Sequence, residues 1–540
     1  MTKNEAKKLI EYVFTNKFEE SFFEKFVSNI FKEYKPLSSV REGQSIKDAF
    51  KPQIAKYKVM GSFSDAEGND VDILLVALNN INTLQRSRTL QRNFVADYLN
   101  TNNKEAAIVA FVTNKDEWRF SLVKLDHSLQ VIEDKLKTKK EVTPARRWSF
   151  LVGKNEGSHT AQSRFIKLLT SDEKPNLSEL ESAFNIESVT KEFFDRYTEL
   201  FFSLEEHLQK LINSDESIKE DFAGKEIPTA DFAKKTLGQI VFLYFLQKKG
   251  WFGVASDKDW GSGPKNFLRE VFNRREKYGK NFFNDILEPL FYEGLAQDRG
   301  EKAIYTRLNN VRMPFLNGGL FEPMNDYQWE TTDIIIPDEL FSNDVTDTKT
   351  GDVGTGILDV FDRYNFTVNE NEPLEQEVAV DPEMLGKVFE NLLEIKDRKS
   401  RGAFYTPREI VHYMCQETLV NYLEAETENI DKSDIEFFIR QGELILENDK
   451  TTANKIAEKE DRGYEYKGVY SYILPQSIID NAKDIDKLLY NIKVADPAVG
   501  SGAFPLGMLN EIVRARRVIG VHTKDNKKVY TLKKETISNS

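Results

Sequence analysis

The chain has almost no cysteine and no long apolar run. Cys415 is the only cysteine among 540 residues, which excludes an internal disulfide and a cysteine-rich zinc site. So little cysteine is typical of a reducing compartment, and we expect the chain in the cytoplasm. No apolar stretch approaches the ~20 residues that a membrane span needs. None of the five histidines has a metal-ligand spacing with Cys415 or another histidine. Because no apolar stretch is long enough for a span, we expect no membrane partner.

The chain also has no excess of positive charge. It carries 75 lysines and arginines against 88 aspartates and glutamates, a formal net charge of −13. Proteins that bind nucleic acid over a broad face are usually basic, because phosphate contacts need lysine and arginine. The acidic total therefore argues against strong non-specific DNA binding, while a local basic groove stays compatible with it.

What the sequence does have is enough apolar material for several cores. Hydrophobic residues make up 40% of the chain, and roughly 150 residues per domain predict three or four domains. Over residues 1–170, helical patterns alternate with short runs rich in valine, isoleucine and phenylalanine at 70–78, 106–113 and 118–125. Such runs are typical of strands. We expect an α/β or α+β domain here, with a sheet at its centre.

Residues 171–395 have the pattern of an all-α domain. The run 232–250, FAKKTLGQIVFLYFLQKKG, is apolar almost all round and predicts a buried helix that stops at Gly250. The stretch 343–356 is rich in aspartate, threonine and glycine without apolar periodicity, and it predicts an exposed loop. Three tryptophans lie in apolar contexts and are expected in the core: Trp118, Trp148 and Trp251.

Residues 396–540 begin a third unit. Thr406 is a good helix N-cap, Pro407 suits the first helical position, and Glu409 completes a capping box. Further along, residues 491–504 read NIKVADPAVGSGAF. This order predicts a strand, then a glycine loop, then a helix, which is a design for binding a phosphate or a nucleoside.

The spacing within the glycine loop excludes two common ligand classes. A P-loop needs a lysine after its second glycine, and none follows Gly502. A dinucleotide fingerprint needs a third glycine where this chain has Pro505. What remains is the arrangement Asp-Pro-x-x-Gly-x-Gly, which starts at Asp496.

This arrangement resembles a known family. DPAVGSGAF (496–504) resembles motif I of class I, S-adenosylmethionine-dependent DNA methyltransferases of the adenine-N6 type, and GAFYTP (402–407) resembles their motif X. The segments 312–323 and 365–390 resemble the helical region before the methylase in large type IIG restriction–modification enzymes, and 389–415 resembles its lead-in. The resemblance runs from about residue 180 to the end and is weaker over the first 170 residues.

The resemblance implies a function for residues 396–540. They would begin a Rossmann-like methyltransferase domain, whose substrate would be adenine N6 in double-stranded DNA, with DNA cleavage coupled to methylation. The residues implied in S-adenosylmethionine binding are Phe404, Tyr405, Thr406, Pro407, Asp496, Pro497, Ala498, Gly500, Ser501, Gly502 and Phe504.

The family's base-binding motif, Asp/Asn-Pro-Pro-Tyr/Phe, is absent, since the chain contains no Pro-Pro dipeptide. No catalytic residue for methyl transfer is therefore predicted here. We expect the N-terminal half of a larger enzyme, inactive alone, whose partner is a segment carrying the rest of the methyltransferase and a target-recognition domain. Two alternatives stay open: a methyltransferase acting on RNA or protein, and a non-catalytic subunit that gives scaffold and DNA contacts.

In the resembled enzymes the first domain is often a PD-(D/E)xK nuclease, which joins an aspartate and a Glu-x-Lys on Mg²⁺. Asp65, Asp70 and Asp72 are available, but the place for Glu-x-Lys reads Leu75-Val76-Ala77. The nearest alternative, Asp126 with Glu133-Asp134-Lys135, lies in a charged run typical of a solvated turn. We expect nuclease-like topology with Asp72 on a strand. We expect no convergence of two carboxylates and a lysine, and Mg²⁺ binding only in a competent nuclease.

The segment after the first strand predicts a helix with three arginines. Arg86, Arg88 and Arg92 are candidates for contacts to DNA phosphates. On a helix beside a sheet, they are equally compatible with ordinary surface charge.

Overall fold

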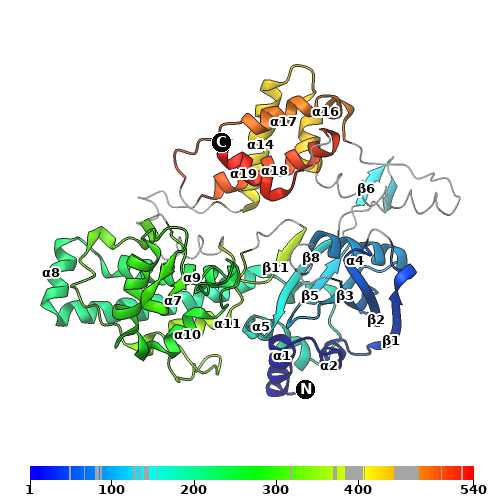
Figure 1. Cartoon of the computed structure of the whole chain (residues 1–540). Helices are drawn as coiled ribbons and strands as arrows, with labels where there is room; N and C mark the ends of the chain where they lie inside the picture. The colour runs from blue at the N-terminus through cyan, green and yellow to red at the C-terminus, as the bar shows by residue number, and fades with distance from the viewer. Residues whose placement is uncertain are drawn as a thin grey trace. The chain divides into compact units, whose positions relative to one another are not determined.

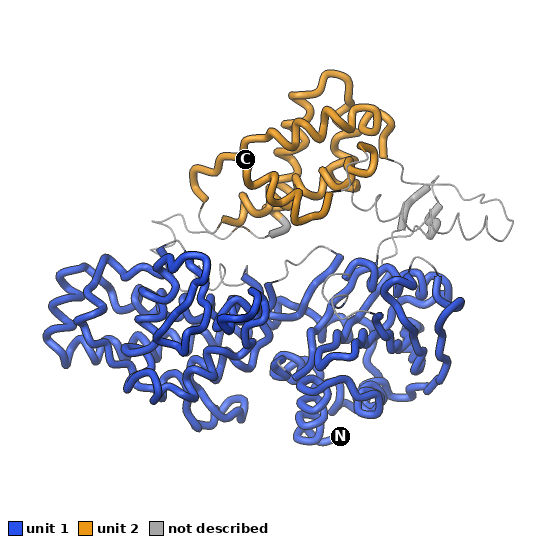
Figure 2. The backbone as a smooth tube through the Cα atoms, in the orientation of Figure 1, with its two compact units in different colours: residues 1–125, 145–392 blue, residues 126–144, 393–540 orange. Residues whose placement is uncertain are grey.

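The structure is a computed structural model of the whole chain. It describes residues 1–47, 50–65, 67–79, 84, 88–125, 129–132, 135–138, 145–154, 156–316, 319–368, 374–382, 406, 408–442, 474–499, 502–523 and 527–539. Two compact units divide the chain: residues 1–125 with 145–392, and residues 126–144 with 393–540 (Figure 2). The fold is mixed α/β, with one large sheet and many helices, as expected.

A seven-stranded sheet organises the first unit (Figure 1). Its strands, in spatial order, are β1 (Lys35–Glu42), β2 (Ile54–Ser64), β3 (Asp70–Leu78), β4 (Ala106–Val112), β5 (Glu117–Lys124), β8 (Arg146–Gly153) and β11 (Glu375–Glu377). Neighbours pair antiparallel except β3 with β4 and β8 with β11, which are parallel. The strands predicted at 70–78, 106–113 and 118–125 are confirmed as β3, β4 and β5.

Helices cover both faces of this sheet at its centre, which is why β3 and β4 read as nearly continuous apolar runs. Alternate residues of β4 point to opposite faces, so Ile108 joins one core and Val109 the other. The first core packs against α1 (Lys3–Thr15), α2 (Glu20–Ile30) and α5 (His159–Thr170). The second packs against α4 (Arg88–Asn102), which connects β3 to β4.

The rest of the first unit is mainly helical. Its α-helices are α6 (Leu177–Ala183), α7 (Ile186–Ser214), α8 (Glu216–Gly224), α9 (Thr229–Lys249), α10 (Phe267–Asn273) and α11 (Ile357–Arg363). Two π-helical turns, Phe283–Leu287 and Leu290–Leu295, and a small hairpin, β9 (Ile304–Tyr305) with β10 (Val311–Arg312), complete it. Helix α9 is buried over most of its length and ends at Gly250 with φ +72°, as predicted.

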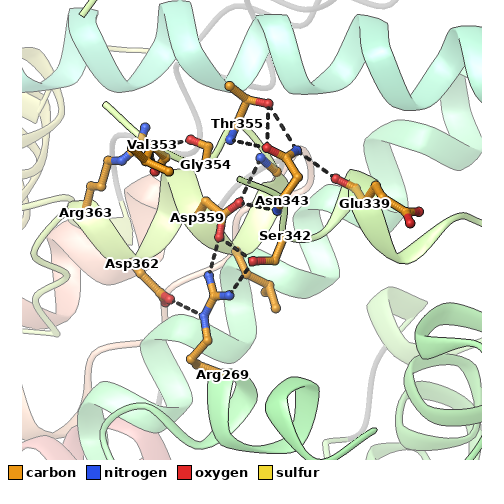
Figure 3. Close-up of polar contacts among 12 residues, drawn as sticks. Arg269, Glu339, Ser342, Asn343, Val353, Gly354, Thr355, Asp359, Asp362 and Arg363 are labelled. Carbon is orange, nitrogen blue, oxygen red and sulfur yellow. Dashed lines mark hydrogen bonds and ion pairs between the residues drawn. The ribbon is translucent and has the colours of Figure 1, made fainter. Parts of the chain in front are cut away.

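The loop 343–356 is mostly exposed, as predicted, and a polar network holds it (Figure 3). The Asp359 carboxylate of α11 accepts hydrogen bonds from the Ser342 hydroxyl at 2.6 Å and the Asn343 amide at 2.9 Å. Arg269 of α10 donates to Asp359 at 2.9 Å and to Asp362 at 2.6 Å. The network therefore ties the loop to two helices, while Phe341 and Ile357 on either side of it are buried in the first core.

The three tryptophans expected in the core behave differently. Trp118 is buried and Trp148 is half-buried against the first core. For Trp251 the expectation is wrong, because 39% of it is exposed. It directly follows Gly250, so the turn that ends α9 carries it away from the buried helix face.

The second unit is helical over most of its described residues. Its helices are α14 (Arg408–Glu426), residues 432–442, α16 (Gln476–Asp480), α17 (Ala482–Asn491), α18 (Ala503–Thr523) and α19 (Val529–Asn539). A separate hairpin pairs β6 (Leu129–Ile132) with β7 (Lys135–Thr138). Among all the described residues, no helix is both long and apolar enough to cross a membrane.

The strand predicted at 491–494 is wrong. Asn491 is the last residue of α17, and residues 492–495 have no regular structure. A strand is stabilised by its neighbours, and no described strand pairs with this segment. Ile492 instead packs into the helical core of the unit.

Candidate functional site

The glycine loop leads directly into a helix, as the sequence predicts. Gly502 adopts φ +79°, a left-handed conformation that favours glycine. Its amide donates to the Val499 carbonyl at 2.7 Å, and its carbonyl accepts from the Leu506 amide at 3.1 Å as α18 begins. The first N–H groups of a helix have no partner within it and carry a positive partial charge. The start of α18 can therefore hold an anionic group.

Asp496 uses only one of its carboxylate oxygens within the loop. Its Oδ1 accepts from the Ala498 amide at 3.0 Å, which closes a local turn. Its Oδ2 is buried and has no hydrogen-bond partner among the described residues. A buried acceptor of this kind needs a donor, and the ammonium or hydroxyl groups of S-adenosylmethionine are suitable donors. The described residues of the loop thus fit the cofactor that the resemblance implies.

The two segments that resemble motifs X and I pack together through their helices. A Cβ on Gly507 of α18 would lie 2.7 Å from the Val411 side chain and 3.2 Å from the sulfur of Cys415 in α14. Glycine at this position therefore allows the close approach. The Cys415 thiol also donates to the Phe504 carbonyl at 3.7 Å.

The remaining cofactor candidates divide into described and undescribed residues. Thr406 and Phe504 are half-buried, and Pro497 and Ala498 are exposed. The other five lie outside the described residues: Phe404, Tyr405, Pro407, Gly500 and Ser501.

A buried carboxylate behind the loop joins α14 to α18, and sequence reasoning missed it. Glu511 is 2% exposed; it contacts His412 Nδ1 at 2.7 Å and accepts from Gln416 at 3.1 Å and Arg514 at 2.7 Å. Burial alone would raise its pKa, but the bond with His412 and the Arg514 charge hold the pKa below its usual value. A glutamate on the buried face of an apolar helix was the available signal.

At the start of β3, two carboxylates do converge on a lysine, so that part of the prediction is wrong. The ammonium of Lys104 lies 3.1 Å from Asp70 Oδ2 and 3.5 Å from Asp72 Oδ1. Tyr98 of α4 donates to Asp72 Oδ2 at 2.7 Å, and Ser64 donates to Asp70. Lys104 precedes β4, the parallel neighbour of β3, so the sequence offered no Glu-x-Lys spacing to find it by.

The described residues at the start of β3 form an ion pair and not a group of metal ligands. The Lys104 ammonium already supplies the positive charge that a metal ion would bring to the two carboxylates. Burial lowers the pKa of Lys104, but the carboxylates of Asp70 and Asp72 raise it by more. The pKa of Lys104 therefore lies above its usual value. Across the described ranges there is no group of three or more acidic, histidine or cysteine residues suited to a metal ion. Leu75, Val76 and Ala77 lie within β3 and add no ligand.

Asp65 adds no metal ligand either. Both oxygens of Asp65 are engaged: Oδ1 accepts from the amides of Glu67 and Asn69, and Oδ2 accepts from the Asn69 side chain and from the Leu177 amide at 3.0 Å. Asp65 therefore ties the β2–β3 turn to the start of α6. Asp126, Glu133 and Asp134 lie outside the described residues, and of Lys135 only the backbone in β7 is described.

Arg88 and Arg92 belong to a charged cluster that is largely buried. Arg92 is 1% exposed and Arg88 is half-buried. The cluster also contains Arg119, which donates to Glu377 at 3.1 Å, and Arg147, which donates to Glu375 at 2.6 Å. At 1% exposure, Arg92 fits neither expectation, contact with DNA phosphates or ordinary surface charge. Arg86 lies outside the described residues, and DNA contact by Arg86 or Arg88 stays a prediction.

The charges in this cluster depend on one another. Burial would raise the pKa of Glu377, but Arg119 and Arg88 lower it to about 2. Burial lowers the pKa of Arg147 to about 9, although the negative charge of Glu375 acts to raise it. Both glutamates lie on β11, more than 200 residues after their arginine partners, so no local sequence pattern could predict the pairing.

Comparison with known proteins gives one relevant similarity. A curated protein of Methanocaldococcus jannaschii, named as a candidate type II restriction enzyme and methyltransferase, is 27% identical to this chain over 380 residues. The match covers 66% of this chain and 28% of that protein, so the chain spans less than a third of the relative's length. No family model and no solved structure matches the chain.

Proposed function

We propose that this chain is the cofactor-binding part of a restriction–modification enzyme that methylates adenine N6 in double-stranded DNA with S-adenosylmethionine. The observation that carries the proposal is the contact between α14 and α18, together with the buried Asp496 Oδ2, which has no hydrogen bond to the described residues. The similarity to the Methanocaldococcus protein supports restriction–modification over the RNA and protein alternatives.

The described residues would hold the methionine end of the cofactor. Gly502 leaves the backbone accessible, since a Cβ there would meet no atom within 4 Å. The start of α18 favours the cofactor carboxylate, and Asp496 Oδ2 accepts from a cofactor donor. Glu511 would act indirectly, because its bonds to His412 and Gln416 hold α14 against α18. S-adenosylmethionine, when bound, supplies an electrophilic methyl group.

Orientation of the adenine amino group needs residues that this sequence does not contain. In the family the Asp/Asn-Pro-Pro-Tyr/Phe motif does this work, and this chain contains no Pro-Pro dipeptide. Without such a motif the nitrogen is neither positioned nor desolvated. We infer that a second polypeptide segment supplies the motif and that the chain alone does not methylate DNA.

Photolabelling with tritiated S-adenosylmethionine tests the cofactor site. We expect weak binding that unlabelled S-adenosylhomocysteine competes away. Asp496→Ala should reduce labelling about tenfold, because one charge-assisted hydrogen bond is worth roughly 1.5–3 kcal/mol. Asp484→Asn, an exposed acid on α17, is the matched control. Equal labelling of wild type and Asp496→Ala would contradict the assignment.

Methyl transfer to mixed-sequence duplex DNA tests the rest of the proposal. The 540-residue chain should give background incorporation of tritium into DNA. A polypeptide carrying an Asn-Pro-Pro-Tyr segment and able to pair with the chain should restore incorporation, at adenine N6. Incorporation by the chain alone would show that the catalytic motif lies elsewhere in it, and transfer to RNA or protein instead of DNA would favour the alternative substrates.

A further inference from the structure

The helical part of the first unit contains an aromatic cavity of about 390 Å³. Its wall includes Trp251, Trp260 and Phe315, which are 39%, 39% and 43% exposed. A volume of this order lies in the range of small-molecule sites. Large aromatic side chains are usually buried. Three that stay partly exposed in one cavity therefore indicate a binding site.

Glycine contacts hold the two tryptophans on one wall. Gly250 ends α9, and its carbonyl accepts from the amides of Gly261 at 2.9 Å and Gly263 at 3.0 Å. A Cβ on Gly250 would lie 2.3 Å from the Gly261 carbonyl oxygen, so the two backbones are in close contact. Trp251 and Trp260 are the chain neighbours of this glycine pair, and the contact therefore brings them together.

The other walls are also fixed by hydrogen bonds. Arg312 and Val254 exchange backbone bonds of 2.7 and 3.2 Å, and the Met313 amide donates to the Ala303 carbonyl at 2.9 Å. Arg299 donates to the carbonyls of Glu293 at 3.0 Å and Met313 at 3.2 Å. The cavity is thus preformed, and Arg299 is engaged in its walls.

Each indole already has a cation over it. The Lys249 ammonium lies 4.4 Å from the Trp251 ring centre, and the Arg312 guanidinium lies 4.4 Å from the Trp260 ring centre. Neither cation is among the residues that line the cavity. A ligand cation would have to compete with Lys249 and Arg312 for the two ring faces, although Asp298 and Glu301 line the same cavity. A neutral planar ring is favoured instead, with its anionic substituent near Lys249 and Arg312.

We propose that this cavity binds an unstacked nucleobase of DNA, stacked on Trp251 and Trp260. Aromatic platforms beside cations are the usual means of holding unpaired bases, because every base has a π-face and carries a phosphate. Glu301 lines the same cavity and offers an acceptor to an exocyclic amino group. The proposal rests on the proposed function only in that the chain acts on DNA.

Fluorescence of an unpaired base tests this site. The probe is a duplex with one unpaired 2-aminopurine, compared with the same duplex fully paired. We expect the chain to quench the unpaired probe and to bind it more tightly than the paired duplex. Trp251→Ala and Trp260→Ala should each weaken binding roughly 5- to 150-fold, while Trp251→Phe should retain most of it. Lys249→Ala should lower the salt dependence by about one ion.

Phe202→Ala is the matched control, since it removes an exposed aromatic ring of α7 that is not part of the cavity. Circular dichroism and thermal unfolding establish that each variant is folded. Tryptophan variants that bind the probe like Phe202→Ala would overturn the proposal. So would quenching of tryptophan emission by tetramethylammonium and not by the oligonucleotide. No S-adenosylmethionine is present, so failure here is distinct from failure of the cofactor site.

Discussion

The acidic end of β3 and the glycine loop before α18 both present aspartates, but their carboxylates are in different states. At β3, the Lys104 ammonium lies near both Asp70 and Asp72, Tyr98 donates to Asp72 Oδ2, and Ser64 donates to Asp70. At the loop, Asp496 keeps one buried oxygen without a partner among the described residues. Asp72 Oδ1 also lacks a hydrogen bond, but the Lys104 ammonium lies 3.5 Å from it, whereas no cation among the described residues pairs with Asp496. The acid that is paired with a cation stabilises the fold, and the one that is not can bind a ligand.

The strongest test of this difference uses the most deeply paired acid. Glu377→Ala would leave Arg119 buried without its partner, which should reduce the free energy of unfolding by about 3–5 kcal/mol. Urea denaturation of the chain, followed by circular dichroism, measures this. A variant as stable as wild type would show that the buried pair does not stabilise the sheet edge.

The same glutamate predicts a pH dependence. Its pKa falls from 4.5 to about 2 on folding, so its contribution is present above pH ~4.5 and is lost as pH falls through about 2. The wild type should therefore lose stability on acidification over this window. Glu377→Gln should remove much of that slope, while Glu181→Gln, a half-exposed acid that pairs with Lys124, should leave it unchanged. Parallel slopes for both variants would contradict the assignment.

A matched pair of alanine substitutions tests the comparison directly. Asp72→Ala removes a buried acceptor from Tyr98 and Lys104 and should destabilise the chain by about 2–3 kcal/mol. Asp496→Ala should change stability by less than about 0.5 kcal/mol while lowering cofactor labelling. Unfolding curves and photolabelling of both variants decide the question, and the reverse pattern would exchange the roles of the two sites.

The smallest expected effect is that of Mg²⁺ on DNA cleavage by the chain. With Lys104 between the carboxylates and no metal cluster in the part of the chain that the structure describes, Mg²⁺ should not produce nicking of plasmid DNA by the purified chain. Agarose gels of supercoiled plasmid measure this. Mg²⁺-dependent nicking that Asp72→Ala abolishes would show that Lys104 moves aside for the metal ion.

Local patterns in the sequence predicted much of the fold. The strands β3, β4 and β5 follow from their β-branched and aromatic runs, and the end of α9 follows from Gly250. The glycine loop and the helix after it were also predictable, because a left-handed residue before a helix needs glycine. The predicted strand at 491–494 failed because strand formation depends on a neighbour, which the local pattern does not contain.

Most helices and strands, the single cysteine and the motif at Asp496 can be predicted from the amino-acid sequence. Only the tertiary structure decided which charges are satisfied. Lys104 joins Asp70 and Asp72 across the parallel pair β3 and β4, and β11 brings Glu375 and Glu377 to arginines far back in the chain. It also turned Trp251 outward beside Trp260. Helix and strand patterns come from interactions between near neighbours, whereas these contacts join residues that only folding brings together.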